Sequence, residues 1–454
     1  MNKYISAIVL AAISSAEVEA QTLQPAPRLV VNITIDQLRT DYIEHFAPLY
    51  SQGGFKKLLG EGRVYEAVCY PFSPVDKASA ITAIATGTTP YYNNIPAERW
   101  LDRNTLRPIF CVDDPKFYAS PQNIATSTIS DELKVSSDGA SVVFGIACLP
   151  DAAILSAGHA ADAAFWIDES SGMWITSEYY SEEARQWLKL YRSKNPQTAK
   201  NKKRTNEEAC NFSLDCITEN SMGRDAVTDY LAVTFSAKGE NKTKWQTEMK
   251  DIYVSLDKVL AQFVSTIEEK IGKDNVLFVL TSTGYTDDPQ VDYAKYHIPT
   301  GTFYINRTAN LLNLYLSAIY GQGMYVETCF HNQIYLNRKL IEKNHISYAD
   351  VVSRSKEFLI QNAGVREVKE SPYTPAISGD LLVEISPGWQ LLNEDNRENF
   401  TWRASFIPFP IIFYGSGIKA EHINTPVTVD CIAPTIAKAI QIRAPNACKE
   451  APLF

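Results

Sequence analysis

The feature that most constrains the fold is a set of five short apolar runs spread along the chain. These runs are rich in β-branched residues and nearly free of polar interruptions, the pattern expected of strands that are covered on both faces of a sheet. They therefore predict a largely parallel sheet at the centre of the protein. The runs are Leu29 to Ile35, Ser141 to Ala147, Tyr230 to Phe235, Val276 to Leu280, and Pro410 to Tyr414.

Helical patterns lie between these runs, and the clearest extends from Thr247 to Ile271. Apolar residues recur there at steps of three and four, which places one apolar stripe along a single face. Gly272 follows directly, and a glycine commonly ends a helix at this position. Strands that alternate with such helices predict an α/β fold, with a doubly wound, mostly parallel central sheet and helices on both faces.

Two stretches interrupt this alternation. Residues 181–226 are polar and charged and carry no strong strand pattern, so we expect a surface insertion there. Residues 300–396 have helix and strand patterns of their own, and we expect them to form a smaller inserted α+β subdomain. The patterns lie at Leu311 to Tyr320, Gln333 to Leu336 and Tyr348 to Gln361.

The first residues predict export. Lys3 supplies a positive charge, Tyr4 to Ile13 form a short apolar stretch, and Ala20 is a small residue at the end of the segment. This is the form of a cleavable signal peptide, and it is too short to span a bilayer. We expect residues 1–20 to be removed and residues 21–454 to act in the periplasm or outside the cell. No later segment reaches membrane-spanning length.

The charge balance argues against a nucleic-acid partner. The net charge is −9, whereas nucleic-acid binding depends on Lys and Arg side chains that neutralise phosphates. The one basic run, Lys200 to Arg204, is followed at once by Glu207 and Glu208, so we interpret it as a solvated loop.

Eight cysteines in an exported chain make disulfides a reasonable expectation. Cys210 and Cys216 are close enough in sequence to bridge within one insertion, and they form the one pair that we predict. The short paired Cys or Cys/His spacings of structural zinc sites do not occur in the sequence.

Reactive groups in an open α/β sheet lie beyond the carboxyl ends of its strands. Asp36 ends the first apolar run, in the segment TIDQLR. Thr281 to Tyr285 follow the run that begins at Val276, and Ser236 to Glu240 follow the run that begins at Tyr230. These strand ends are where we expect the functional site.

Several segments, taken together and in order, resemble the single-chain periplasmic alkaline phosphatases, close to the nucleotide pyrophosphatase/phosphodiesterase branch. They include TIDQLRTDYI, GGFKKLLGEG, ATGTTP, ERWLDR, AGHAADAAFW, PIIFYGSGI and DCIAPTIAKAIQIRAPN. The resemblance extends over almost the whole mature chain and implies the fold of that superfamily. It also implies hydrolysis of phosphate monoesters with two zinc ions, a Thr or Ser nucleophile, and an Asn, a Lys and an Arg that hold the phosphate oxygens.

Carried over residue by residue, the resemblance leaves one of the family's ten site residues in place. The first metal ligand is present as Asp36. Lys77 stands at the nucleophile position, Glu98 at the Asn position, and Leu149 and Asp151 at the Lys and Arg positions. The other metal-ligand positions fall on Gly239, Thr243, Thr283, Gly284 and Pro408.

Each replacement has a physical consequence. Zinc needs anionic or imidazole ligands, and an ammonium at Lys77 would repel a dication. Glu98 and Asp151 would repel phosphate where Asn and Arg attract it. Loss of the nucleophile alone can reduce the rate by about a million-fold. We therefore expect a catalytically degenerate pseudoenzyme without a cofactor, which serves as a binding or assembly module for another envelope protein.

The competing interpretation is a zinc-dependent phosphate-ester hydrolase, either a phosphomonoesterase or a phosphodiesterase. In that case the site either lies elsewhere in the fold or is matched to the wrong residues in the comparison with the family. Thr82 and Ser79 lie near Lys77 and could then serve as hydroxyl nucleophiles. For Asp36 we favour a structural role, a hydrogen bond with the amides near Leu38 and Arg39, over residual metal binding.

The chain has six histidines, and none has a His or Cys partner at a ligand spacing. His159, in AGHAADAAFW, is the one nearest to a motif, and we expect a structural residue that packs beside Trp166.

Overall fold

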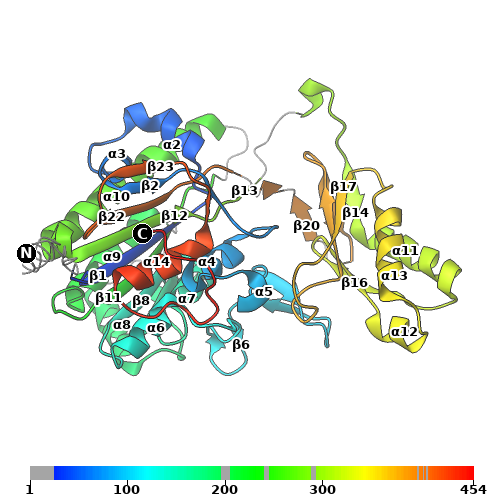
Figure 1. Cartoon of the computed structure of the whole chain (residues 1–454), viewed down its shortest axis with the longest axis horizontal. Coiled ribbons are helices and arrows are strands. Elements are labelled where there is room, and N and C mark those ends of the chain that lie inside the picture. The colour runs from blue at the N-terminus through cyan, green and yellow to red at the C-terminus, as the bar shows by residue number, and fades with distance from the viewer. Residues whose placement is uncertain are drawn as a thin grey trace, which may run out of the picture.

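The protein is seen in a computed structural model that describes residues 25–195, 205–239, 245–287, 293–395, 398–401, 403–404 and 407–454. A nine-stranded sheet forms its centre, with the strand order β10-β9-β8-β11-β1-β12-β22-β2-β23 (Figure 1). In that order the strands are Trp174–Ile175, Ala163–Ile167, Val143–Ala147, Asp229–Ser236, Leu29–Asp36, Val276–Ser282, Ile411–Gly415, Arg63–Tyr65 and Glu421–Ile423.

The sheet contains all five of the predicted strands, and four of them, β8, β11, β1 and β12, are parallel neighbours. Leu29 of β1 is opposite Asp229 of β11 on one side and Val276 of β12 on the other. β22 joins β12 in the antiparallel direction. Its direction is reversed because β12 ends at the carboxyl edge, the chain then builds the smaller lobe, and it returns at the same edge. The prediction of a mostly parallel sheet is confirmed. The sheet also contains β9 and the three short strands β10, β2 and β23, which no apolar run indicated.

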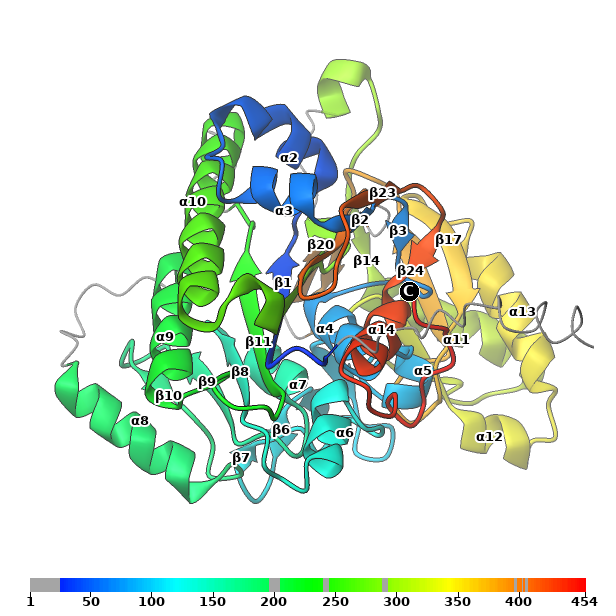
Figure 2. The ribbon, with the colours of Figure 1, turned by 60° about the vertical axis from the view of Figure 1, so that its left-hand side comes forward.

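Helices cover both faces of the sheet, as predicted (Figure 2). One face carries α2 (Thr40–Phe46), α3 (Phe55–Glu61), α9 (Asn206–Glu219) and α10 (Trp245–Ile271). The other face carries α4 (Lys77–Thr86), α6 (Ile129–Ser136), α7 (Pro150–Ala157) and α14 (Ile432–Ala439). The predicted stop of α10 is confirmed, because Gly272 follows it with a φ of +95°, a conformation that favours glycine.

The polar segment 181–226 forms α8 (Glu182–Lys194) and α9 rather than a purely superficial insertion. Phe212 of α9 is buried and stacks on Trp174 of β10, with ring centroids 4.1 Å apart. The segment therefore contributes to the main core, because its few apolar residues are concentrated on the inner face of α9.

The predicted disulfide between Cys210 and Cys216 is wrong. Both residues are buried free thiols on α9. Six residues along an α-helix separate their Cα atoms by about 9 Å, whereas a disulfide needs less than about 7 Å.

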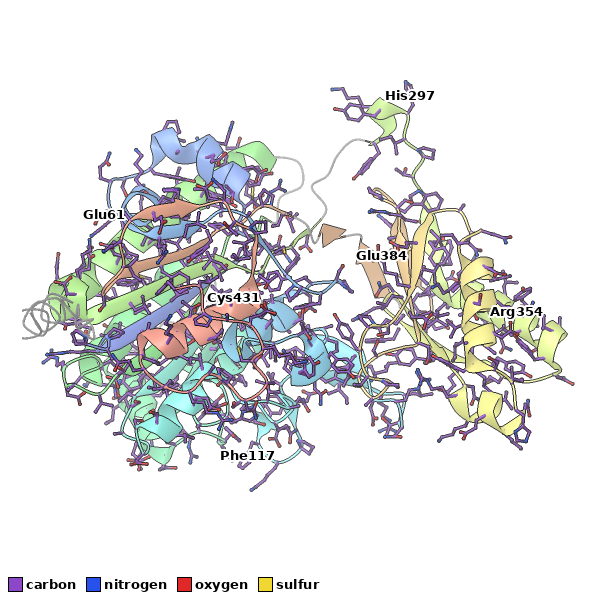
Figure 3. All side chains as sticks on the ribbon, in the orientation of Figure 1. Glu61, Phe117, His297, Arg354, Glu384 and Cys431 are labelled. Atoms are coloured by element: carbon purple, nitrogen blue, oxygen red, sulfur yellow. The ribbon has the colours of Figure 1, made fainter. Side chains whose placement is uncertain are left out.

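The smaller lobe is built from residues of the predicted subdomain and has its own hydrophobic core. In Figure 1 it lies to the right of the main sheet, and in Figure 3 it carries Arg354 and Glu384, whereas Glu61 and Cys431 lie in the main body. Its strands are β14 (Thr302–Tyr304), β15 (Val326–Phe330), β16 (Gln333–Leu336), β17 (Val365–Glu370), β18 (Leu381–Ile385), β19 (Gln390–Asn393) and β20 (Glu398–Thr401). Its helices are α11 (Ile305–Tyr320), α12 (Arg338–Lys343) and α13 (Tyr348–Leu359).

Short elements connect these parts. They are α5 (Pro90–Asn93) and the strand pairs β3 (Val68–Cys69) with β24 (Val427–Thr428), β4 (Arg99–Leu101) with β5 (Pro108–Phe110), β6 (Asp113–Asp114) with β7 (Tyr118–Ala119), and β13 (Thr286–Asp287) with β21 (Arg403–Ala404). The β4–β5 hairpin reaches the smaller lobe through Arg103, whose guanidinium donates to the buried carboxylate of Asp380 at 2.8 Å.

Within the described segments, no helix combines the length and the apolar character needed to cross a membrane. The predicted signal peptide, residues 1–20, and the basic run from Lys200 to Arg204 lie outside the described residues.

Candidate functional site

A pocket of about 810 Å³ lies beyond the carboxyl ends of β1, β8 and β11. Four of the residues singled out from the sequence line it together, although they come from four separate parts of the chain. They are Asp36, Lys77, Glu98 and Leu149. The fifth, Asp151, is buried directly behind Lys77.

Lys77 is held at the pocket by the start of α4. Asp76 caps this helix, because its carboxylate accepts a hydrogen bond from the Ser79 amide at 2.9 Å. The Ser79 hydroxyl in turn accepts from the Asp76 amide at 3.0 Å, which completes a capping box. A cation in the first turn of a helix is disfavoured by the helix dipole, so the position of Lys77 depends on nearby anions.

The principal anion is Asp151, in the first turn of α7. Its carboxylate lies 2.8 Å from the Lys77 ammonium, and the two side chains are 2% and 12% exposed. Burial alone would lower the pKa of Lys77, but the charge and hydrogen bond of Asp151 outweigh it, and the pKa is raised. Lys77 is therefore a positive charge at any physiological pH.

Glu98 lies at the mouth of the pocket, on the loop before β4. Its amide donates to the second carboxylate oxygen of Asp76 at 2.7 Å, so one capping residue positions both Lys77 and Glu98. Desolvation raises the pKa of Glu98, and the charges of Asp151 and Asp76 add to this, while Lys77 opposes it. Glu98 is exposed to solvent, so water screens these charges in part, and the direction of the shift favours the protonated form.

Asp36 ends β1 at the floor of the pocket. The Thr283 hydroxyl donates to its carboxylate at 2.9 Å and accepts from the Gln37 amide at 2.9 Å. The predicted hydrogen bond with the amides near Leu38 and Arg39 is wrong, because those amides donate to the Ile35 carbonyl and to the Tyr253 hydroxyl. Burial raises the pKa of Asp36, and Lys77 and the Thr283 hydroxyl oppose this.

Four other predicted metal-ligand positions are Gly239, Thr243, Gly284 and Pro408. Gly284 has a φ of +68°, and a Cβ there would lie 2.4 Å from the Tyr70 ring. The carbonyl of exposed Pro408 accepts from the Thr40 amide at 2.8 Å. Gly239 is partly buried at the end of a described segment, and Thr243 lies outside the described residues.

A family model for type I phosphodiesterases and nucleotide pyrophosphatases matches residues 30–405. This range includes the central sheet up to β12, the pocket residues and the smaller lobe. The chain belongs to this family.

Curated relatives match nearly the full length. The chain is 25% identical to the alkaline phosphatase PafA of Elizabethkingia meningoseptica, over 94% of each protein. It is 24% identical to the alkaline phosphatase PhoV of Synechococcus elongatus, over 97% of this chain and 96% of that protein. The crystal structure of wild-type PafA superposes with a TM-score of 0.79 at 24% identity, covering 94% of this chain and 98% of the other.

These matches overturn the expectation of a degenerate pseudoenzyme, which is wrong. PafA and PhoV, which match this chain from end to end, are alkaline phosphatases by name, and nothing in the comparisons indicates a degenerate member. They support the competing interpretation, a phosphate-ester hydrolase of this family. The expectation was wrong because it assumed that a chain without the family's site side chains cannot catalyse the family's reaction.

The zinc pair implied by the resemblance does not fit the side chains of this pocket. Across the described ranges, no three His, Cys, Asp or Glu side chains form a group that could hold a metal ion. The charges that act on Asp36 are instead the ammonium groups of Lys77 and Lys238. We therefore derive no catalytic step through zinc.

Sequence reasoning missed several residues of the site. Lys238 forms an ion pair with Asp287 at 3.1 Å, and Asp287 also accepts from the Gln37 side chain at 3.2 Å. The Thr234 hydroxyl of β11 is buried at the pocket wall and has no hydrogen-bond partner among the described residues. The spacing of Asp76 and Ser79 could have indicated the helix cap, and Lys238 directly follows a predicted strand.

The two hydroxyls considered as substitute nucleophiles are engaged elsewhere. The Thr82 hydroxyl is buried and donates to the Ala78 carbonyl at 2.8 Å. Ser79 takes part in the helix cap and also donates to the Asp76 carbonyl at 3.1 Å. Both bonds are made to the backbone of α4 or its cap, so neither residue is a nucleophile in this arrangement.

His159 lies outside the pocket and has a structural role. Its Nδ1 is 3.0 Å from the Asp131 carboxylate, and its Nε2 is 3.1 Å from the Ile124 carbonyl. Burial alone would lower the pKa of His159, but Asp131 outweighs it, and the pKa is raised. Burial would raise the pKa of Asp131, but the hydrogen bonds from His159 and from the Ala160 amide lower it.

We expect the His159→Gln variant to lose stability mainly in mildly acidic solution. The stability contributed by His159 is fully present below about pH 6.5, the unfolded pKa, and is lost as the pH rises through the higher folded pKa. The contribution of Asp131 is present above about pH 3.9 and is lost as the pH falls. Urea unfolding should therefore show a larger loss for His159→Gln at pH 5 than at pH 8, with His45→Gln as the exposed control. Equal losses at both pH values would contradict this.

Proposed function

We propose that this chain hydrolyses phosphate esters in the pocket beyond β1, β8 and β11. The observation that carries the proposal is the pairing of two groups at one wall of the pocket. Lys77 is a charged ammonium fixed by Asp151, and Glu98 is a carboxyl group with a raised pKa. Lys77 binds a phosphoryl oxygen, and Glu98 carries a proton for the leaving group. Ester cleavage requires both of these roles. The names of the full-length relatives support the same reaction class.

Phosphoryl transfer needs little covalent help from a protein, because its transition state is loose and its charge is spread over the equatorial oxygens. Catalysis is therefore mostly positioning and charge stabilisation. In this pocket the Lys77 ammonium stabilises that charge, and the Thr234 hydroxyl is available to donate a hydrogen bond to the same group.

In the proposed step, a water oxygen forms a bond to phosphorus while the bond from phosphorus to the ester oxygen breaks. Protonated Glu98 gives its proton to the leaving oxygen. One proton of the attacking water then returns to Glu98. A monoester thus gives an alcohol and inorganic phosphate, and a diester gives an alcohol and a monoester.

The pocket volume lies within the range of roughly 300 to 1,000 Å³ that is common for small-molecule sites. We propose small phosphate monoesters and diesters as the substrates, and the periplasm or the cell exterior as the place of action.

The test of this function is the Glu98→Gln variant, which keeps the shape of the side chain and removes its proton. We expect initial rates of phosphate release to fall about 10²-fold for an alkyl phosphate, whose leaving oxygen needs protonation. The fall should be smaller for 4-nitrophenyl phosphate, because nitrophenolate leaves without a proton.

The matched control is Glu207→Gln, which alters another acid that lines the same pocket. We expect this variant to keep its rates on both substrates. Equal rates for wild type and Glu98→Gln on the alkyl ester would exclude the proposed role of Glu98.

A further inference from the structure

We infer that the pocket holds its anion through Lys77 and Thr234 and does so without a zinc pair. The identity of the anion, a phosphoryl group, rests on the proposed function. The family resemblance assigns the positive charge of such a pocket to zinc. Here the Lys77 side chain supplies that charge.

Both ammonium groups at the floor of the pocket already have carboxylate partners. Lys77 is paired with Asp151 at 2.8 Å, and Lys238 is paired with Asp287 at 3.1 Å. Both ammonium groups act on Asp36, which receives a hydrogen bond from Thr283 as well. A dication placed beside Asp36 would therefore be repelled by two ammonium groups and would find one carboxylate not already engaged by a lysine, which is a poor exchange for its water shell.

Packing also keeps ligand side chains out of this floor. A Cβ at position 284 would lie 2.4 Å from the Tyr70 ring, and Tyr70 is fixed because its hydroxyl donates to the Ser282 carbonyl at 2.7 Å. A metal-ligating side chain at position 284 would require both the turn and Tyr70 to move. At position 284 the lack of a ligating side chain is thus built into the packing and is more than a change of a surface residue.

Thr234 supplies an independent observation that points to a ligand at this wall of the pocket. Its side chain is about nine-tenths buried at the pocket wall, and its hydroxyl has no partner among the described residues. A buried hydroxyl without a partner is costly unless a ligand or water satisfies it. An ammonium has three donors, and the bond to Asp151 uses one, so Lys77 can donate to the same ligand.

The experiment uses the full mature chain. Its zinc content is measured by elemental analysis after chelator treatment, and binding of inorganic phosphate is then measured by calorimetry. We expect less than one zinc per chain and phosphate binding that the chelator leaves unchanged. Lys77→Met should weaken that binding by at least about tenfold, because a charge-assisted hydrogen bond is lost. Thr234→Val should weaken it less.

Lys273→Met is the control, because Lys273 pairs with exposed Glu61 at the opposite edge of the sheet. If Lys77→Met does not fold, Lys77→Met/Asp151→Leu removes both charges of the pair and takes its place. Tightly held zinc, or phosphate binding that disappears on chelation, would overturn the inference and leave the hydrolase proposal standing. Chelator-resistant phosphate binding without ester hydrolysis would support the inference and refute the proposed function.

Discussion

The Asp151→Ala variant is expected to lose about 3 to 5 kcal/mol of unfolding free energy, because it leaves the Lys77 ammonium buried without its partner. The two side chains are 2% and 12% exposed, so water can replace only part of the lost carboxylate's interaction. The helix dipole of α4 adds to the cost, because it opposes a cation in the first turn. Urea denaturation at pH 7 measures this loss directly.

Two controls separate the buried pair from ordinary surface charge. Glu182→Ala breaks an ion pair with Arg185 whose side chains are 58% and 34% exposed, and it should cost less than about 1 kcal/mol. Lys77→Met/Asp151→Leu replaces the buried pair by apolar groups and should recover most of the stability. A cost for Asp151→Ala no larger than that for Glu182→Ala would show that the pair is not buried in solution.

The second large effect concerns activity. Lys77→Met should lower kcat/KM for phosphate esters by about 10²- to 10³-fold, the range found when one preorganised donor to a developing charge is removed. Lys77→Arg keeps the charge and should retain part of the activity, although its planar head has a different shape. Initial rates with 4-nitrophenyl phosphate at matched protein concentration measure both variants.

Loss of folding could imitate loss of catalysis, and the double variant guards against this. Lys77→Met/Asp151→Leu is expected to be folded and yet as inactive as Lys77→Met. Full activity in this folded double variant would remove Lys77 from the catalytic account.

The central sheet was predictable because its strands are buried on both faces and are therefore continuous apolar runs. β1, β11 and β12 follow this rule, and the buried register of Leu29 between Asp229 and Val276 agrees with it. β2 and β23 are strands of three residues at one end of the sheet order, and their half-polar sequences carry no such pattern. The inward face of α9 was missed for a related reason, since the surrounding charges mask its apolar residues.

Asp36 could be placed from a strand end, and Lys77 and Glu98 from the family resemblance, but the interactions of these residues could not be predicted. Asp36, Lys77 and Glu98 were placed by sequence at the edge where the structure brings them together. The hydrogen bond from Thr283 to Asp36 joins residues 247 positions apart in sequence, and the Thr234 hydroxyl has no partner among the described residues, so no local pattern indicates either feature. The prediction of function failed because substituted side chains were treated as lost chemistry, whereas a buried ion pair can supply charge of its own.

The most direct test of the account is phosphate-ester hydrolysis by the wild-type chain in the presence of a chelator. The measured quantity is the initial rate of 4-nitrophenol release from 4-nitrophenyl phosphate, relative to Lys77→Met/Asp151→Leu prepared in the same way. The account predicts turnover that persists with the chelator and is reduced at least about 10²-fold in the double variant. A wild-type rate no higher than that of the double variant, or a rate that chelation abolishes, would contradict it.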